Sequence, residues 1–515
     1  MALSNQYIKK SPMKHFLSFC FALLFCLYIN TSSANCTIYN SDGSVTSPKE
    51  DALYKILSRQ QSCPVDVLDF KSILTQAKLT VQPTMVANRG FHNPDLGSFS
   101  FFEIVQGQLI EENLTVKKGD FFFGHFTEAV DNKIVLDQTL TENKLMIELI
   151  VWDPRKQWYH FYELRGTETA SSWFYRGDSL DALNDNQYLH RDPPAGTPKF
   201  GDRMRCSACH NSGGPIMKEI QAPHNDWWLS QHPLPLGKNE PDADVSTQMR
   251  ALIDADLLSL SVLDGMQQLE NSLPYQSSKK ALSLQEQMRP VFCEVEINLQ
   301  SDSMPLDAAR MINIPSAFFI TPFLYEDFFV MDKVAYEKYL VEVGMNFPET
   351  TRKDADHAWL IPVKGTSDLK AIQALIDQKI IDNKFAAAVL STDLQNPVFS
   401  SNRCELLKFV PQQFSNDWLS EFLFALKGSD LPHAHILYSQ LVNPDYTFEY
   451  YVNEAQKMTR QIQARLQDPS EQAYFFQKMI ASRHAVTASE ISQNPLGQIL
   501  EPGFRVIFPE AKGQP

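Results

Sequence analysis

Long apolar runs are scarce in this 515-residue sequence, and basic side chains are in the minority. The run from Phe16 to Ile29 is shorter than the roughly 20 residues that a membrane-spanning helix needs, and no later run reaches that length. Lys and Arg number 46 against 61 Asp and Glu, which gives a formal net charge of −15. An acidic surface repels nucleic acid and anionic lipid. This balance argues against nucleic-acid binding, and it suits solubility or a basic protein partner.

Several familiar functional patterns are also missing. The sequence contains no internal repeat and no low-complexity tract, which excludes a solenoid or a linker array. It also lacks the G-x-S-x-G, G-x-x-x-x-G-K-[ST], G-x-G-x-x-G and H-E-x-x-H patterns. Hydrolase, nucleotide-binding and zinc-protease functions therefore have no support from motifs.

The N-terminus has the pattern of a secretory signal. Lys9, Lys10 and Lys14 precede the apolar run, and the small polar stretch Asn30 to Ala34 follows it. We expect a signal peptide over residues 1–34, cleaved after Ala34, and an exported protein that is periplasmic or secreted, with no membrane span after cleavage. Removing this segment would leave 43 basic and 61 acidic side chains.

The cysteines fit an oxidising compartment. Of the eight in the chain, two lie in the N-terminal segment and two in a motif described below. The other four are Cys36, Cys63, Cys293 and Cys404. Disulfides persist outside the cytoplasm, and sequence order suggests the pairs Cys36–Cys63 and Cys293–Cys404, although four cysteines allow three connectivities.

The first part of the chain is predicted to be rich in β-strands. The segment 145–152 is apolar and β-branched, Asp153 to Lys156 has turn composition, and Gln157 to Leu164 returns as a second strand. Aromatic residues fall on both faces of that second strand, as in a strand buried on two sides. Further strands are expected over 119–126 and 133–138, with a turn at Asp131-Asn132. A sandwich or a barrel-like sheet is the predicted arrangement.

The composition of the chain changes after this β-rich part. Residues 188–241 are rich in Pro, Gly, His and Asn, which is typical of loops. Helices are predicted over 334–343, over 415–427 and over 448–466, where apolar residues recur at spacings of three and four. The expected fold class is α+β. Its parts are a β-rich domain at 35–187, a loop-rich cofactor-bearing region at 188–300 and a mainly helical domain at 301–515.

One short stretch stands out, "CSACH" at 206–210. From the composition of this chain, roughly 0.003 matches to C-x-x-C-H are expected by chance. A structural zinc site would want a second ligand pair, which the isolated Cys293 and Cys404 do not supply. A thioredoxin-like dithiol should follow a buried strand, whereas a polar, proline-rich stretch precedes Cys206. A local disulfide with an incidental histidine is the remaining alternative.

The pattern resembles the haem attachment motif of c-type cytochromes. The resemblance covers some twenty residues and implies one covalent haem c. Cys206 and Cys209 would form thioethers to its vinyl groups, and His210 would be the proximal iron ligand. In small cytochromes c a Gly-Pro pair beyond the motif often supplies the carbonyl that holds the proximal imidazole. Gly214-Pro215 would have that role here, or would be no more than a loop turn.

The sixth iron ligand is left open by the sequence. Methionine would give a cytochrome-like pair, histidine would give bis-histidine ligation at a lower potential, and an open position would admit a small ligand. The methionines that follow the motif and the nearby histidines are the candidates: Met217, Met249, Met266, Met288, His190 and His224.

Three functions follow from the resemblance. The first is an exported mono-haem cytochrome that transfers electrons to or from a redox protein partner, for which the acidic surface favours a basic one. The second is a haem-dependent, peroxidase-like oxidoreductase with an open sixth iron position, because the chain is much longer than the about 100 residues that an electron carrier needs. The third is a non-enzymatic haem sensor or binding protein. The sequence does not decide whether the chain is an enzyme.

Overall fold

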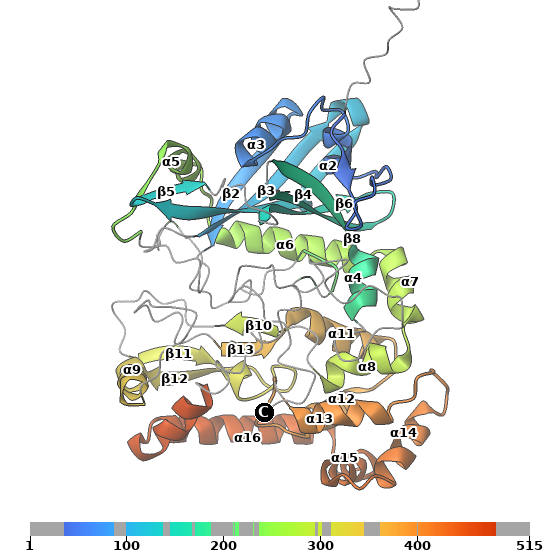
Figure 1. Ribbon diagram of the computed structural model, residues 1–515. Helices are drawn as coiled ribbons and strands as arrows, with labels where there is room; N and C mark the ends of the chain where they lie inside the picture. The colour runs from blue at the N-terminus through green and yellow to red at the C-terminus, as the bar shows by residue number, and fades with distance from the viewer. Residues whose placement is uncertain are drawn as a thin grey trace, which may run out of the picture.

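A nine-stranded sheet dominates the N-terminal half of the chain in the computed structural model (Figure 1). The structure describes residues 35–86, 99–136, 145–166, 170–186, 210, 212–215, 230, 236–293, 297–300, 311–343, 361–398 and 400–479. The strand order is β1-β8-β7-β6-β4-β3-β2, while β5 pairs with both β4 and β9. The strands are β1 Ile38–Tyr39, β2 Leu79–Val86, β3 Ser100–Leu109, β4 Leu114–Val130, β5 Lys133–Leu136, β6 Leu145–Asp153, β7 Trp158–Gly166, β8 Ser171–Asp178 and β9 Glu240–Pro241.

The predicted hairpins are present in this sheet. Strands β6 and β7 pair antiparallel, and the register at the turn brings Asp153 opposite Trp158. The Asp153 carboxylate accepts hydrogen bonds from the backbone N–H groups of Arg155 (2.8 Å) and Lys156 (2.9 Å), which fixes the turn. Strands β4 and β5 are joined by Asp131 and Asn132, both with positive φ, as a tight hairpin turn requires. Both turns were predicted from their composition.

Helices cover the two faces of the sheet. Helices α2 (Ala52–Leu57) and α3 (Val67–Gln76) lie on one face, and α6 (Ala255–Glu270) crosses the other (Figure 1). Alternation along β7 sends Tyr162 into the core under α2 and α3, and it sends Tyr159 and Phe161 into the core under α6. Within the described residues, a single sheet between helices therefore replaces the expected sandwich or barrel-like sheet. Strands buried on two sides are equally apolar whether a helix or a second sheet covers them.

A glycine lets α6 approach the sheet closely. A Cβ atom placed on Gly265 would lie 2.6 Å from the Tyr159 hydroxyl oxygen, 2.7 Å from Cγ of Pro215 and 2.8 Å from the carbonyl oxygen of Gly119. No side chain fits in that space. The Tyr159 hydroxyl donates a hydrogen bond of 2.6 Å to the Gly119 carbonyl, so this contact also satisfies a buried polar group.

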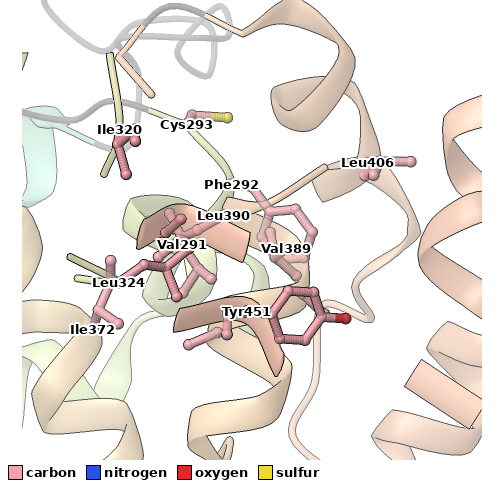
Figure 2. Close-up of a cluster of buried hydrophobic side chains, with 14 of the residues drawn as sticks. Val291, Phe292, Cys293, Ile320, Leu324, Ile372, Val389, Leu390, Leu406 and Tyr451 are labelled. Carbon is pink, nitrogen blue, oxygen red and sulfur yellow. The ribbon is translucent and has the colours of Figure 1, made fainter. Parts of the chain in front are cut away.

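The C-terminal half is mainly helical, as predicted. Its core gathers side chains from α8 (Leu284–Phe292), α11 (Thr366–Asp377), α12 (Asn383–Leu390) and α16 (Phe448–Leu466). Figure 2 shows part of this core, including Val291, Ile372, Leu390 and Tyr451. Two small antiparallel sheets accompany the helices, formed by β10 Ile297–Gln300 with β13 Ile361–Lys364 and by β11 Met311–Pro315 with β12 Phe328–Asp332. The fold is therefore broadly α+β. The boundaries proposed at residues 187 and 300 stay a prediction.

Further helices accompany α2, α3 and α6, and side-chain caps are common at the N-termini of the described helices. Most begin at a Ser, Thr or Asp whose side chain accepts a hydrogen bond from the backbone N–H three residues on, as Asp66 and Thr447 do. These helices are α4 Ser179–Asn186, α5 Ala243–Arg250, α7 Leu273–Ala281, α8 Leu284–Phe292, α9 Lys333–Glu342, α11 Thr366–Asp377, α12 Asn383–Leu390, α13 Ser401–Glu405, α14 Trp418–Lys427, α15 Pro432–Val442 and α16 Phe448–Leu466. The 3-10 turns are η2 Ile110–Glu112, η4 Ser316–Phe318 and η5 Leu406–Phe409.

The three predicted helices are confirmed as α9, α14 and α16. The apolar stripe of α16 buries Tyr451, Ala455, Ile462 and Leu466, which have the predicted spacing. Helix α14 begins at Trp418, three residues later than predicted, and ends before Gly428 as expected. None of the helices in the described part of the chain combines the length and apolarity required to cross a membrane.

Two disulfides join the cysteines that the sequence order paired. Cys36 is bonded to Cys63 in the N-terminal half, and Cys293 is bonded to Cys404 in the C-terminal half. The second bond links residues that are 111 positions apart, from the end of α8 to α13. Both pairings are confirmed, and they suit a protein that resides in an oxidising compartment.

Candidate functional site

The structure places part of the predicted haem site. His210 and residues 212–215 are described, and they lie beside α4, β7 and α7. Cys206, Cys209, Met217, His190 and His224 lie outside the described residues. The site can therefore be built from the histidine and the residues that hold it.

The imidazole of His210 is held by the Gly-Pro pair that follows it. Its Nδ1 lies 2.7 Å from the carbonyl oxygen of Gly214. A carbonyl oxygen only accepts hydrogen bonds, so Nδ1 carries the proton of the neutral ring and the lone pair is on Nε2. The ring of Phe161 lies 5.5 Å from the His210 ring, between centroids, at an angle of 42°. This carbonyl contact is the one that the resemblance implied for Gly214-Pro215.

A tight turn brings that carbonyl back to the histidine. The backbone N–H of Gly213 donates to the His210 carbonyl at 2.8 Å, closing a turn of four residues. Gly213 has a φ of 78°, and a Cβ on it would lie 2.5 Å from the carbonyl oxygen of Ser179. Both the backbone conformation and the space require glycine here. We call residues 210–215 the His210 turn.

Two hydroxyl groups fix the His210 turn to the rest of the fold. Ser179, the first residue of α4, donates from Oγ to the Gly213 carbonyl at 2.7 Å and accepts from the backbone N–H of Tyr159 at 2.8 Å. The Tyr275 hydroxyl, from α7, donates to the Ser212 carbonyl. Ser179 is fully buried and Tyr275 nearly so, so these bonds do not compete with solvent. The carbonyls of Ser212 and Gly213 are therefore hydrogen-bonded to two different helices, α7 and α4.

The far end of the His210 turn packs on α6. Pro215 occupies the space that Gly265 leaves open, and Leu269 lies against Gly214. The hydroxyl of Tyr159 supports the same contact, and burial holds its pKa well above the usual value, so it stays a donor. Since α6 rests directly on the sheet, the backbone that holds His210 packs against the core of the N-terminal half.

Three of the candidate methionines, Met249, Met266 and Met288, lie on helices. Met266 in α6 is 3 % exposed, and its Cγ lies 3.9 Å from the position that a Cβ on Gly214 would take. Met288 is fully buried in the C-terminal core, and Met249 packs at the edge of the core under α3. Met266 thus lies near the residue that supplies the carbonyl, and its role as sixth ligand stays a prediction.

Other histidines serve the structure. The Nδ1 atom of His160 lies 2.8 Å from the Asp51 carboxylate, which also accepts a hydrogen bond of 2.6 Å from the Tyr162 hydroxyl. The Nε2 atom of His160 accepts a hydrogen bond of 3.2 Å from the Trp158 indole. His433 and His435 lie on helix α15. Across the residues that can be described, no group of three or more His, Cys, Asp or Glu side chains is arranged to hold a metal ion.

The supporting residues of the site were not found from the sequence. Ser179 and Tyr275 are 34 and 63 positions from the residues they bind in the turn, and neither belongs to a recognisable motif. Gly265 lies in an ordinary helical pattern. Only the fold brings these residues together. Comparisons with protein families, with curated proteins and with solved structures find no match to this chain.

Proposed function

We propose that this chain is an exported mono-haem c-type cytochrome that transfers electrons. The observation that carries the proposal is the 2.7 Å contact between His210 Nδ1 and the Gly214 carbonyl, four residues after a C-x-x-C-H pattern. A histidine that ligates a metal generally donates its other ring N–H to a carbonyl or carboxylate, which fixes the tautomer and raises the basicity of the ligating nitrogen. The His210 turn has that arrangement.

The donor set suits a covalent haem. His210 would ligate the iron through Nε2, while Cys206 and Cys209 would hold the porphyrin by thioether bonds. Bound haem would supply one-electron redox chemistry. The protein's own part is to hold His210 still, and it does so through Ser179, through Tyr275 and through the packing of Pro215 on Gly265. A rigid ligand reduces the reorganisation that accompanies electron transfer.

The disulfides, the N-terminal segment and the net charge support export and a basic partner. Two disulfides are typical of proteins that reside outside the cytoplasm, where haem c is also attached, and the N-terminal segment has signal-peptide composition. We propose a periplasmic or secreted protein. The net negative charge favours a basic redox protein as partner over nucleic acid.

A haem-dependent oxidoreductase is the second candidate. The observation that favours it is a cavity of about 380 Å³ that Ser212 of the His210 turn helps to line. Coordination separates the two functions: a closed sixth position favours electron transfer, and an iron that binds cyanide or carbon monoxide favours catalysis or a sensor. The test is a titration of the ferric protein with cyanide and of the ferrous protein with carbon monoxide.

The test of the proposal itself compares variants after export through a periplasm that attaches haem c. Haem should stay with the wild-type chain on a denaturing gel and give a reduced pyridine haemochrome, and it should be lost from Cys206→Ala/Cys209→Ala. His210→Ala should keep the covalent haem with a changed spectrum, while the matched exposed variant His435→Ala should match wild type. A wild-type chain without haem under these conditions would refute the proposal.

A further inference from the structure

A second site lies next to the His210 turn. A cavity of about 380 Å³ opens between α4, α7, α8 and α11, which lie together below one end of the sheet (Figure 1). This is within the size range of pockets that bind small organic molecules. Ser212 and Tyr275 belong both to its wall and to the hydrogen bond that holds the His210 turn.

Much of the cavity wall is apolar. Each of the four helices contributes to the apolar part of the wall, and the small side chains of two alanines on α11 leave room in the cavity. The apolar lining residues are Leu183, Tyr275, Leu282, Pro290, Ala371, Ala374 and Leu375. Binding an apolar ligand against this wall is favourable, because it removes apolar surface of both the ligand and the wall from water.

Most charged groups of the wall are paired with a neighbouring charge of opposite sign. Lys279 Nζ lies 3.1 Å from Glu270, and Arg289 bonds both carboxylate oxygens of Glu286 at 2.6 and 2.9 Å. Asp368 is bonded to the buried Lys364 at 2.8 Å. The two charges that remain, Lys280 and Asp377, are exposed and opposite in sign. The cavity therefore presents no net charge to a ligand.

Hydrogen-bonding capacity is left over in the same wall. The amide nitrogens of Gln276 and Gln287 donate to the carbonyls of Glu270 (2.9 Å) and Leu282 (2.8 Å). These bonds identify the nitrogen end of each amide, so the other end is an acceptor oxygen, and no described residue donates to it. The Ser367 hydroxyl is buried without a partner among the described residues. Acceptors in a largely apolar wall without net charge suit a ligand that brings hydroxyl donors.

We propose that this cavity binds a small uncharged aromatic compound that carries a hydroxyl group, of the phenol or naphthol class. The apolar wall takes the ring, the glutamine and serine oxygens take the hydroxyl, and the paired charges disfavour an ion. The binding does not depend on haem. It goes beyond the proposed electron transfer, and either can fail without the other.

Three probes that share one ring system test the chemistry on the full-length exported protein by calorimetric titration. 2-Naphthol is uncharged and donates a hydrogen bond, 2-methoxynaphthalene is uncharged without a donor, and naphthalene-2-sulfonate is an anion. We expect 2-naphthol to bind at least about tenfold more tightly than either of the others, because a ligand without a donor leaves the acceptor oxygens of the wall unpaired. Equal binding of the methoxy compound, tighter binding of the sulfonate or no binding of 2-naphthol would overturn the proposal.

Variants locate the site. Ala374→Trp fills the cavity from α11 and should abolish 2-naphthol binding, whereas Gln373→Trp, its exposed neighbour on the same helix, should leave binding within twofold. Ser367→Ala, which changes no packing volume of consequence, should weaken 2-naphthol several-fold and leave 2-methoxynaphthalene unchanged. Circular dichroism confirms that each variant is folded. Equal loss of affinity in Ala374→Trp and Gln373→Trp, or no loss in either Ala374→Trp or Ser367→Ala, would place the binding elsewhere.

Discussion

The hydroxyl of Ser179 donates a hydrogen bond of 2.7 Å to the carbonyl of Gly213. This contact joins the start of α4 to the His210 turn, and the same oxygen accepts from the backbone of Tyr159 in β7. One buried hydroxyl thus links the sheet, a helix and the residues that hold His210.

Ser179→Ala should loosen the His210 turn. The substitution leaves a buried carbonyl and a buried N–H without this partner, so we expect a loss of about 2 kcal/mol in the free energy of unfolding. Urea unfolding followed by circular dichroism measures it. Ser401→Ala, at an exposed position of α13, is the control and should change stability by less than about 0.5 kcal/mol. An equal effect of the two substitutions would contradict this account of Ser179.

Gly265→Ala should strain the contact between α6, the sheet and Pro215. The new methyl group would meet three atoms at 2.6 to 2.8 Å, and we expect a loss of about 1–3 kcal/mol in stability. Gly428→Ala is the matched control, because the nearest atom to its Cβ would be 3.5 Å away and its φ is −85°. That variant should be neutral or slightly more stable. Thermal unfolding of both proteins compares them, and a Gly265→Ala protein as stable as wild type would show that the contact relaxes freely.

The disulfide between Cys293 and Cys404 should contribute strongly to the C-terminal half. Replacing both cysteines by alanine releases a loop of 111 residues in the unfolded chain, and we expect a loss of about 3–5 kcal/mol. The double variant at Cys36 and Cys63 opens a loop of 27 residues, and on the same reasoning it should lose less. Guanidinium unfolding of the two double variants tests the order. The reverse order would show that native contacts around each bond outweigh loop entropy.

Stability should fall on mild acidification because of a buried pair in the sheet. The Nε2 atom of His125 lies 2.9 Å from the Glu103 carboxylate, which also binds Lys71. His125 and Glu103 are both buried. Burial lowers the pKa of His125 below its usual value. Burial alone would raise the pKa of Glu103, but the charge of Lys71 and the bond from His125 outweigh it, so this pKa is lowered too.

The direction follows from proton uptake. Below pH 6.5 the unfolded chain binds a proton at residue 125 that the folded protein does not, and below pH 4.5 the same holds for residue 103, so the folded state loses stability as the pH falls. Urea midpoints between pH 7.5 and 5.5 should decline in wild type and decline less in His125→Gln. The exposed variant His435→Gln should retain the wild-type slope. An unchanged slope in His125→Gln would refute the assignment.

Local sequence signals predicted a large part of the fold. Turn composition located the hairpins at Asp153 and Asp131, helical periodicity located α16, and sequence order gave both disulfides. Each of these depends on neighbours in sequence or on simple pairing. The predicted layer arrangement was wrong for a different reason. Aromatic residues on both faces of β7 indicate that both faces are buried, but they do not indicate whether a helix or a second sheet covers each face.

The candidate site shows the same division. The C-x-x-C-H pattern and the Gly-Pro pair predicted to hold the histidine lie within ten residues of each other, and the structure shows the contact between His210 and the Gly214 carbonyl. The residues that position this turn, Ser179 and Tyr275, come from other elements and look like any buried serine or tyrosine in the sequence. Long-range packing alone determines their role, so no local pattern reveals them.

The most direct test of the account is the intact mass of the exported protein under denaturing conditions. We predict the mass of a chain that begins at Asn35, contains two disulfides and carries one haem. The mass of the bare chain, with the cysteines of residues 206–209 unmodified, would contradict the central claim and leave the His210 turn as a structural feature of a protein without haem.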